Sequence, residues 1–112
     1  MTSISDDFMR QMLATTRVYS LVLLKAGPNR NRPDIQSLIW EHGRRNFELR
    51  AEGKLAIVGP TLDGGAIAGM GIFATDEAET KRLMDADPAV AAGVFVYEIH
   101  PMKSFPGDRL PQ

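Results

Sequence analysis

Two side chains capable of proton transfer, His42 and Asp87, lie in regions of the chain that are predicted to be helical. Imidazole and carboxylate groups are the ones that proteins use most often for general acid and base catalysis near neutral pH. A carboxylate beside an imidazole orients the ring and favours its protonated form. We therefore take His42 and Asp87 as the candidate catalytic residues, with His42 moving a proton and Asp87 orienting it.

His42 lies on the apolar side of a helix predicted for residues 34–52, with Asp34 at its N-cap and Gly53 as its stop. Successive residues of a helix are rotated by about 100°. One side of this helix therefore carries Ile35, Leu38, Ile39, His42, Asn46, Leu49 and Gly53. The imidazole is expected to face a sheet. A core histidine satisfied by a single hydrogen bond fits the same pattern.

A second helix is predicted for residues 76–86, where Asp76 and Glu79 resemble a capping box. The spacing of residues 80, 83, 84 and 87 places Asp87 on the face of this helix that also carries Leu83 and Met84. Because both helices are expected on the same side of the sheet, His42 and Asp87 can approach each other. Asp87 followed by Pro88 also fits a turn that only ends a helix.

Three further residues are predicted to bind a substrate. Asn46 follows His42 by one helical turn, and Gly59 and Pro60 end a short strand beside the same helix. A tight turn is the alternative role for Gly59 and Pro60. Gly43, in mid-helix, costs about 1 kcal/mol relative to alanine, which suggests a close approach by backbone or ligand there.

Two aromatic residues and the second histidine complete the chemical inventory. Trp40 and Phe47 are seven residues apart and are expected on the flank of the helix away from the sheet, as an oligomer contact. His100 has no second ligand at metal-binding spacing, and the chain contains no cysteine. No metal site is therefore expected.

The elements that position these residues follow the order β-α-β-β-α-β. Strands are predicted at residues 18–25, 55–58, 66–74 and 93–100, and a short amphipathic helix at residues 5–15. This order is the ferredoxin-like α+β arrangement, a four-stranded antiparallel sheet with two helices on one face. We divide the chain into an N-terminal helical extension (1–17), the ferredoxin-like domain (18–101) and a C-terminal tail (102–112).

The sheet is expected to be apolar on both faces. Leu21 and Leu23 point to one side of the first strand, and Val22 and Leu24 point to the other. Helices can cover only one of these faces, so a second copy of the chain is the simplest cover for the other. We expect a homodimer packed sheet to sheet, and the N-terminal helix, Trp40 and Phe47 offer contacts for a higher oligomer.

The composition excludes several classes of protein. The 112 residues suffice for one domain, with 44% apolar and 24% charged residues. A net charge of −1 gives no basic surface for nucleic acid or an anionic membrane. The absence of cysteine excludes disulfides and thiolate chemistry. The chain shows no apolar segment of membrane-spanning length and no signal peptide, so a cytoplasmic location is expected.

Several short motifs occur in a fixed order between about Tyr19 and Pro101: Trp40-Glu41-His42, Ala51-Glu52-Gly53-Lys54-Leu55, Val58-Gly59-Pro60, Ala68-Gly69-Met70-Gly71-Ile72, Asp85-Ala86-Asp87-Pro88, and Ala92-Gly93-Val94 through His100-Pro101. In this order and spacing, they resemble the YCII-related (YciI-like) domain family. The resemblance implies a dimeric α+β barrel with an active site built on a histidine and an aspartate, which fall on His42 and Asp87.

This resemblance also suggests an activity. One branch of the family is a dehydrochlorinase acting on a chlorinated hydroxyquinol, and the wider barrel superfamily includes muconolactone isomerases and small monooxygenases. This chain departs from the family pattern in its N-terminal extension, in the long loop at residues 26–33, and in Gly43-Arg44, where leucine commonly follows the histidine. Those departures affect the shape of the pocket.

The leading functional prediction is a small enzyme without a cofactor, a lyase or isomerase resembling the dehydrochlorinase. It would use His42 and Asp87 for proton transfer on a small cyclic metabolite. The alternative is a dimer of the same fold that binds a small ligand or serves as an accessory subunit without catalysis. A third class is an oxygenase using haem or quinone, with His42 or His100 as a ligand.

Overall fold

The computed structural model describes residues 2–112, and its elements confirm the predicted α+β order. Two helices that the ferredoxin-like pattern does not require, α1 and α4, are added to it. In chain order the elements are α1 (Asp6–Ala14), β1 (Arg17–Ala26), α2 (Ile35–Ala51), β2 (Leu55–Pro60), β3 (Ile67–Phe73), α3 (Glu77–Asp85), α4 (Pro88–Ala91) and β4 (Phe95–Ser104).

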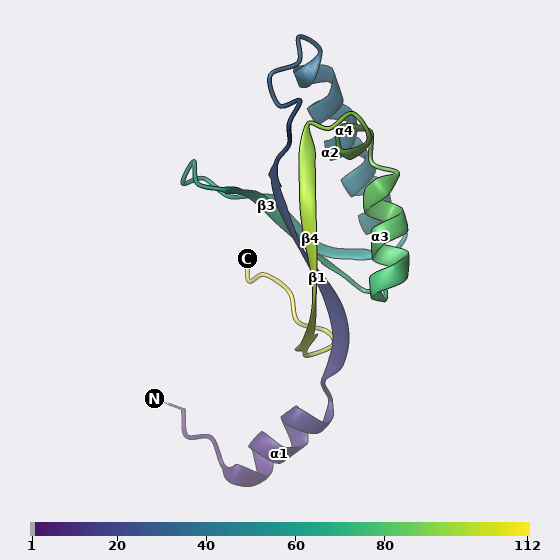
Figure 1. The fold of residues 1–112 in the computed structure, drawn as a ribbon. Coiled ribbons are helices and arrows are strands. Elements are labelled where there is room, and N and C mark those ends of the chain that lie inside the picture. The colour runs from purple at the N-terminus through teal and green to yellow at the C-terminus, as the bar shows by residue number, and fades with distance from the viewer. Residues whose placement is uncertain (1) are drawn as a thin grey trace.

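The four strands form one antiparallel sheet in the order β2-β3-β1-β4. Helices α2, α3 and α4 cover one face of this sheet, as Figure 1 shows. The ferredoxin-like fold with helices on one face is therefore confirmed. It brings α2 and the segment that follows α3 to the same side of the sheet, which the proposed site requires.

The core lies between the helices and the sheet because side chains alternate along β1. Val22 and Leu24 face the helices and are buried, whereas Leu21 and Leu23 face outward and are partly exposed. The buried cluster consists of Val22, Leu24, Leu49, Leu55, Phe73 and Met84. Apolar residues thus occupy both faces of β1, as the sequence predicted.

The outer face is less uniformly apolar than the sequence suggested. Across β4, Leu21 pairs with His100 and Leu23 pairs with Glu98, so these residues share that face. Glu98 forms an ion pair with Lys25, and its Oε2 atom lies 3.0 Å from the Nε2 atom of His100. The outer face is therefore apolar along β1 and β3 and charged along the β4 edge.

Two strands run farther than predicted, and each contains a proline. β2 includes Pro60, and β4 continues through Pro101 to Ser104 instead of ending at His100. Proline cannot donate a ladder hydrogen bond, so strands tolerate it at a sheet edge. Both β2 and β4 are edge strands in this sheet.

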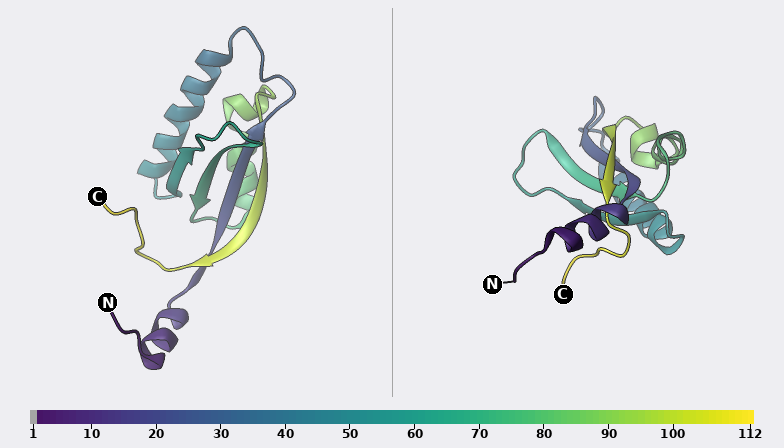
Figure 2. Two further views of the ribbon diagram at one scale, coloured as in Figure 1. Left: turned by 90° about the vertical axis from the view of Figure 1, so that its left-hand side faces the viewer. Right: turned by 90° about the horizontal axis from the view of Figure 1, so that it is seen from below.

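The ends of β1 and β4 extend beyond the rest of the sheet as a two-stranded arm. Arg17 pairs with Ser104 and Val18 with Lys103, whereas the pairing of β1 with β3 begins only at Ser20. Helix α1 lies at the tip of this arm, far from the other helices (Figure 2). No helix among residues 2–112 is long and apolar enough to span a membrane.

The two predicted helix starts differ in detail. The Asp76 carboxylate accepts a hydrogen bond from the Glu79 amide at 2.8 Å, so the cap of α3 is confirmed. Asp34 is at the N-cap position of α2, but its carboxylate bonds to Arg32 instead of capping the helix. The hydrogen bond from Arg32 lowers the pKa of Asp34.

Candidate active site

His42 and Asp87 form a hydrogen-bonded pair beneath α2. The Nδ1 atom of His42 lies 2.7 Å from the Oδ2 atom of Asp87. The side chain of Asp87 is only 4% exposed, and that of His42 is 15% exposed. The expected proximity of the two groups is confirmed, with the histidine nearer to solvent and the carboxylate behind it.

Asp87 reaches this position by a different route from the one predicted. Helix α3 ends at Asp85, and Asp87 is the N-cap of the separate short helix α4. Pro88 therefore begins a helix instead of ending one, in keeping with the preference of proline for the first helical position. The Oδ1 atom of Asp87 accepts the amides of Ala89 at 2.9 Å and Val90 at 3.2 Å.

These hydrogen bonds fix the carboxylate on both of its oxygens. Because a carboxylate only accepts hydrogen bonds, the proton of a neutral His42 ring is assigned to Nδ1. The Nε2 atom is then left as an acceptor. The Nδ2 atom of Asn46 lies 3.4 Å from Nε2, and the ring of Phe95 packs against the imidazole with centroids 5.2 Å apart. The arrangement suits a general base whose working atom is Nε2.

A cavity of about 350 Å³ lies between α2 and the sheet, next to the imidazole. Four of the five predicted site residues line it: His42, Asn46, Gly59 and Pro60. Asp87 does not line the cavity; its carboxylate contacts the imidazole of His42, which does. The remaining walls are mostly apolar and include Val22, Leu24, Leu55, Val58, Met84 and Phe95. A concave apolar space with a few polar groups is typical of small-molecule sites.

The sequence of the domain that contains this cavity matches a known protein family. The family model of the YCII-related domain matches residues 18–103. The chain belongs to the YCII-related domain family. This confirms the resemblance seen in the sequence motifs, and the match covers all elements after α1 except the end residues Arg17 of β1 and Ser104 of β4.

Two solved structures resemble this YCII-related chain. One is the 5-chloro-2-hydroxyhydroquinone dehydrochlorinase of Burkholderia phenoliruptrix in complex with 2,5-dihydroxybenzoquinone, with a TM-score of 0.52 and 22% identity, over 73% of this chain and 90% of that one. The other is a protein of Agrobacterium tumefaciens, with a TM-score of 0.47 and 16% identity, over 85% and 100%. The first likeness establishes a shared fold. No curated protein matches the chain.

Two glycines of β3 form part of the cavity wall and were not predicted as site residues. A Cβ atom added at Gly69 would lie 3.0 Å from the carbonyl oxygen of Gly59. At Gly71 it would lie 3.3 Å from the side chains of Leu55 and Phe73. Glycines at alternate positions of a strand signal a close approach of this kind. The sequence signal for this wall was therefore the alternating glycines of the Ala68-Gly69-Met70-Gly71-Ile72 motif.

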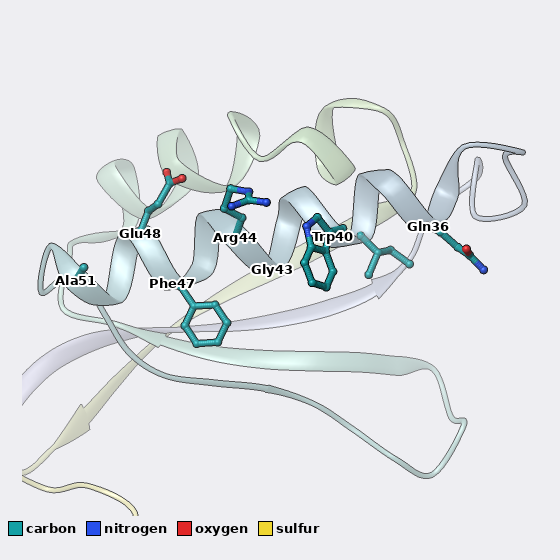
Figure 3. A pocket seen from close by; sticks show the side chains of 8 residues that line it. Gln36, Trp40, Gly43, Arg44, Phe47, Glu48 and Ala51 are labelled. Carbon is teal, nitrogen blue, oxygen red and sulfur yellow. The ribbon is translucent and has the colours of Figure 1, made fainter.

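Phe47 lies elsewhere than predicted. It lines the cavity together with Ile39 and Gly43, so it is on the flank of α2 that borders the sheet. The same three residues also line an adjoining open groove of about 740 Å³, whose lining residues all belong to α2 and include Trp40 (Figure 3). Trp40 and Phe47 are 69% and 65% exposed, so their predicted exposure is confirmed.

His100 is remote from the cavity, on the outer face of the sheet, where its Nε2 atom lies 3.0 Å from Glu98. Within residues 2–112, no three histidine, aspartate or glutamate side chains are grouped as a metal site would require. The polar side chains named in the cavity wall are those of His42 and Asn46, with Asp87 hydrogen-bonded to the imidazole.

Proposed function

We propose that this YCII-related protein is a small enzyme of lyase or isomerase type that needs no cofactor and moves a proton on a small cyclic substrate. One observation carries the proposal. A buried carboxylate holds the Nδ1 edge of His42, while the ring lines an apolar cavity with its Nε2 atom beside Asn46. A general base requires this combination of fixed orientation and access.

Each polar residue of the cavity has a proposed role. His42 accepts a proton at Nε2 and later returns it. Asp87 holds the ring and stabilises the imidazolium that forms during the transfer. Asn46 shifts its amide from Nε2 to an oxygen of the bound substrate. Gly59 and Pro60 shape the wall opposite α2 and leave room for a flat ring.

The proposed substrate is a hydroxylated six-membered ring. The dehydrochlorinase that shares this fold suggests the reaction, loss of HCl from a chlorinated hydroxyquinol. His42 would carry one hydroxyl proton to the carbon that bears chlorine. A second hydroxyl would then lose its proton, and its electron pair would form a carbonyl and expel chloride. The products are a hydroxyquinone, a proton and chloride, and no external oxidant is needed.

The proposed assembly is a homodimer in the cytoplasm, formed through the outer face of the sheet. This face carries Leu21 and Leu23 of β1, with Ile72 and Met70 of β3 directly opposite them. All four are partly exposed in a single chain. Apolar surface of this kind, extending over neighbouring strands, supports contact with a second copy.

One contact favours a second candidate function, binding without catalysis. The amide of Asn46, 3.4 Å from Nε2, gives the second imidazole nitrogen a partner within the chain. A histidine that is bonded on both sides suits a structural or ligand-holding role. Measuring chloride release and ligand binding distinguishes this role of His42 from catalysis.

The test uses 5-chloro-2-hydroxyhydroquinone as substrate, under anaerobic conditions because hydroxyquinols are oxidised by air. Chloride release is measured for the parent protein, for His42→Gln and for His100→Gln, which alters the histidine on the outer face. Turnover by the parent and His100→Gln, but not by His42→Gln, supports the proposal. Turnover that persists in His42→Gln overturns the role of His42. Calorimetric binding of 2,5-dihydroxybenzoquinone, together with no chloride release from 5-chloro-2-hydroxyhydroquinone, supports binding alone.

A further inference from the structure

Helix α1 is held away from its own domain. The two-stranded arm of β1 and β4 carries it beyond the end of β3, as Figures 1 and 2 show. Only Thr15 and Thr16 separate α1 from β1, and their hydroxyls donate to the carbonyls of Met12 and Leu13 at 2.7 and 2.9 Å. The residues between α1 and β1 are therefore hydrogen-bonded to the helix. With α1 held at the end of the arm, the molecule measures 56 Å in its longest direction and 30 and 23 Å in the other two.

This helix lacks the packing that normally stabilises a short helix. None of its nine residues is buried. Phe8, Met9 and Leu13 are between 46% and 57% exposed. Isolated helices shorter than about 12 to 15 residues are marginal in water, and most helical stability comes from packing of an apolar face. The apolar side of α1 therefore requires a surface outside its own chain.

The groove along α2 has the residue spacing and the length needed to accommodate a helix such as α1. Trp40, Gly43 and Phe47 follow one another along it at intervals of three and four residues, which is the spacing of helix-packing positions. Lined from Gln36 to Ala51, the groove is about 22 Å long, whereas the nine residues of α1 span about 13 Å. Apart from its chain neighbours and the backbone of α2 itself, no atom of residues 2–112 comes within 4 Å of a Cβ added at Gly43. The close approach that this glycine suggested is not made by its own chain.

We propose that α1 of one copy packs into the α2 groove of a second copy. Its own groove is excluded because the arm leads away from α2 and places the two helices at opposite ends of the molecule (Figures 1 and 2). The charge of Asp6, in the first turn of α1, complements that of Arg50, whose guanidinium lies 5.5 Å from the centre of the Phe47 ring. The other charges contribute less, because Asp7 pairs with Arg10 and Arg44 pairs with Glu41, and Glu48 also lines the groove.

This contact would also complete the candidate active site. Ile39, Gly43 and Phe47 line both the groove and the cavity beside His42, so the two spaces adjoin at these residues. A helix packed on Phe47 covers the open side of the cavity and reduces its contact with water. The inference rests on the self-association in the proposed function and is independent of its chemistry.

The composition of the chain allows a direct test, because it contains no cysteine. Chains carrying Phe8→Cys are mixed with tagged chains carrying Gly43→Cys and allowed to oxidise. A mixed disulfide supports the proposal if it exceeds the yield with Glu77→Cys, a control on the exposed surface of α3. An equal yield overturns it. A disulfide that closes within single chains of the doubly substituted Phe8→Cys/Gly43→Cys variant also overturns it.

A second measurement uses Trp40, the only tryptophan of the chain. In the full-length protein, Phe8→Asp with Leu13→Asp should shift the Trp40 emission to the red and increase its quenching by acrylamide. Asp7→Asn, on the polar side of α1, should change neither. An unchanged emission in the doubly substituted variant overturns the proposal.

Sedimentation of the parent protein separates the two possible failures. A monomer would refute the homodimer of the proposed function, and it would also refute the exchange of α1, in which α1 of one copy packs into the α2 groove of a second. A dimer without the mixed disulfide would refute only the exchange.

Discussion

The imidazole of His42 and the carboxylate of Asp87 are joined by a hydrogen bond of 2.7 Å, although 45 residues separate them in the sequence. Two different structural devices bring them together. The apolar stripe of α2 turns His42 toward the sheet, and the N-cap of α4 holds Asp87 by two backbone amides. The carboxylate therefore cannot rotate without losing its cap, and it sets which nitrogen of the imidazole carries the proton.

Asp87→Asn should reverse the tautomer of His42 while preserving the fold. The asparagine oxygen can still accept the amides of Ala89 and Val90, but its NH₂ group donates toward Nδ1. The ring proton must then move to Nε2, which can no longer accept a proton. We expect turnover to fall by about 10² to 10⁴-fold, the usual contribution of a positioned base.

The tautomer can be measured without a substrate. Two-dimensional ¹⁵N–¹H NMR of the imidazole should show Nδ1 protonated in the parent protein and Nε2 protonated in Asp87→Asn. The signals of His100 should stay the same in both proteins and serve as an internal control. An unprotonated Nε2 in Asp87→Asn would contradict the orienting role of Asp87.

The pair should also be coupled in stability. His42→Phe keeps an aromatic ring against Phe95 but leaves the buried carboxylate without its partner. Removing one hydrogen-bond donor from a buried carboxylate in this way costs about 1 to 3 kcal/mol. In the Asp87→Asn background the same substitution should cost less, with a coupling of about 1 to 3 kcal/mol. Urea denaturation of the four proteins measures this cycle, and strictly additive effects would show that the contact contributes nothing.

The sequence predicted the histidine better than the carboxylate, for a physical reason. The helical period of α2 covers enough residues to fix the direction of His42. Asp87 and Pro88, by contrast, satisfy both the end of one helix and the start of another. Ala89, in the turn that follows Pro88, is fully buried. The packing of this turn against the rest of the domain is what favours the start of a new helix over the end of the previous one. That packing is a tertiary property, which two adjacent residues do not encode.

The errors at the prolines and at Phe47 have a similar cause. Whether Pro60 and Pro101 can lie within strands depends on those strands being at the edges of the sheet. Strand order is a property of the whole fold. The position of Phe47 depends on how α2 is rotated and tilted over β2. The helical period shows which side of α2 faces the sheet, but not how far around the helix the contact with the sheet extends. The position of a residue at the border of that contact, such as Phe47, therefore cannot be predicted from the period.

The two glycines of β3 should respond differently to alanine. A methyl group at Gly69 meets the backbone oxygen of Gly59 at 3.0 Å, so the strands must move apart. Overpacking of this kind costs about 1 to 3 kcal/mol. A methyl group at Gly71 makes its closest contacts, at 3.3 Å, with the side chains of Leu55 and Phe73, and the nearest backbone atom is at 3.8 Å. Gly71→Ala should therefore preserve most of the stability but narrow the cavity.

Thermal unfolding and calorimetric titration with 2,5-dihydroxybenzoquinone separate the two effects. Gly69→Ala should lower the melting temperature more than Gly71→Ala does, and Gly71→Ala should weaken binding. Gly65→Ala, in the turn between β2 and β3, is the control for the loss of glycine outside the cavity. Ligand binding to Gly71→Ala with unchanged affinity would show that the ligand does not reach the floor of the cavity.

The charged edge of the outer face should make stability depend on pH in the acidic range. A hydrogen bond from Lys25, and a weaker one from His100, lower the pKa of Glu98 below its ordinary value of 4.5. A carboxyl group whose pKa is lowered by folding stabilises the protein above its unfolded pKa. That contribution is lost as the pH falls through the lowered value. The effect should be small because these side chains are exposed to solvent.

Glu98→Gln removes this titration but keeps the size of the side chain. We expect the parent protein to be the more stable of the two at pH 6, with a difference that shrinks as the pH falls below 4.5, the ordinary pKa of Glu98. Urea denaturation across this range measures the difference. Glu77→Gln, which alters a surface carboxylate of α3, is the control and should leave the pH dependence unchanged. A parent protein that gains stability over Glu98→Gln on acidification would contradict the assigned ion pairs, because it would require a raised pKa for Glu98.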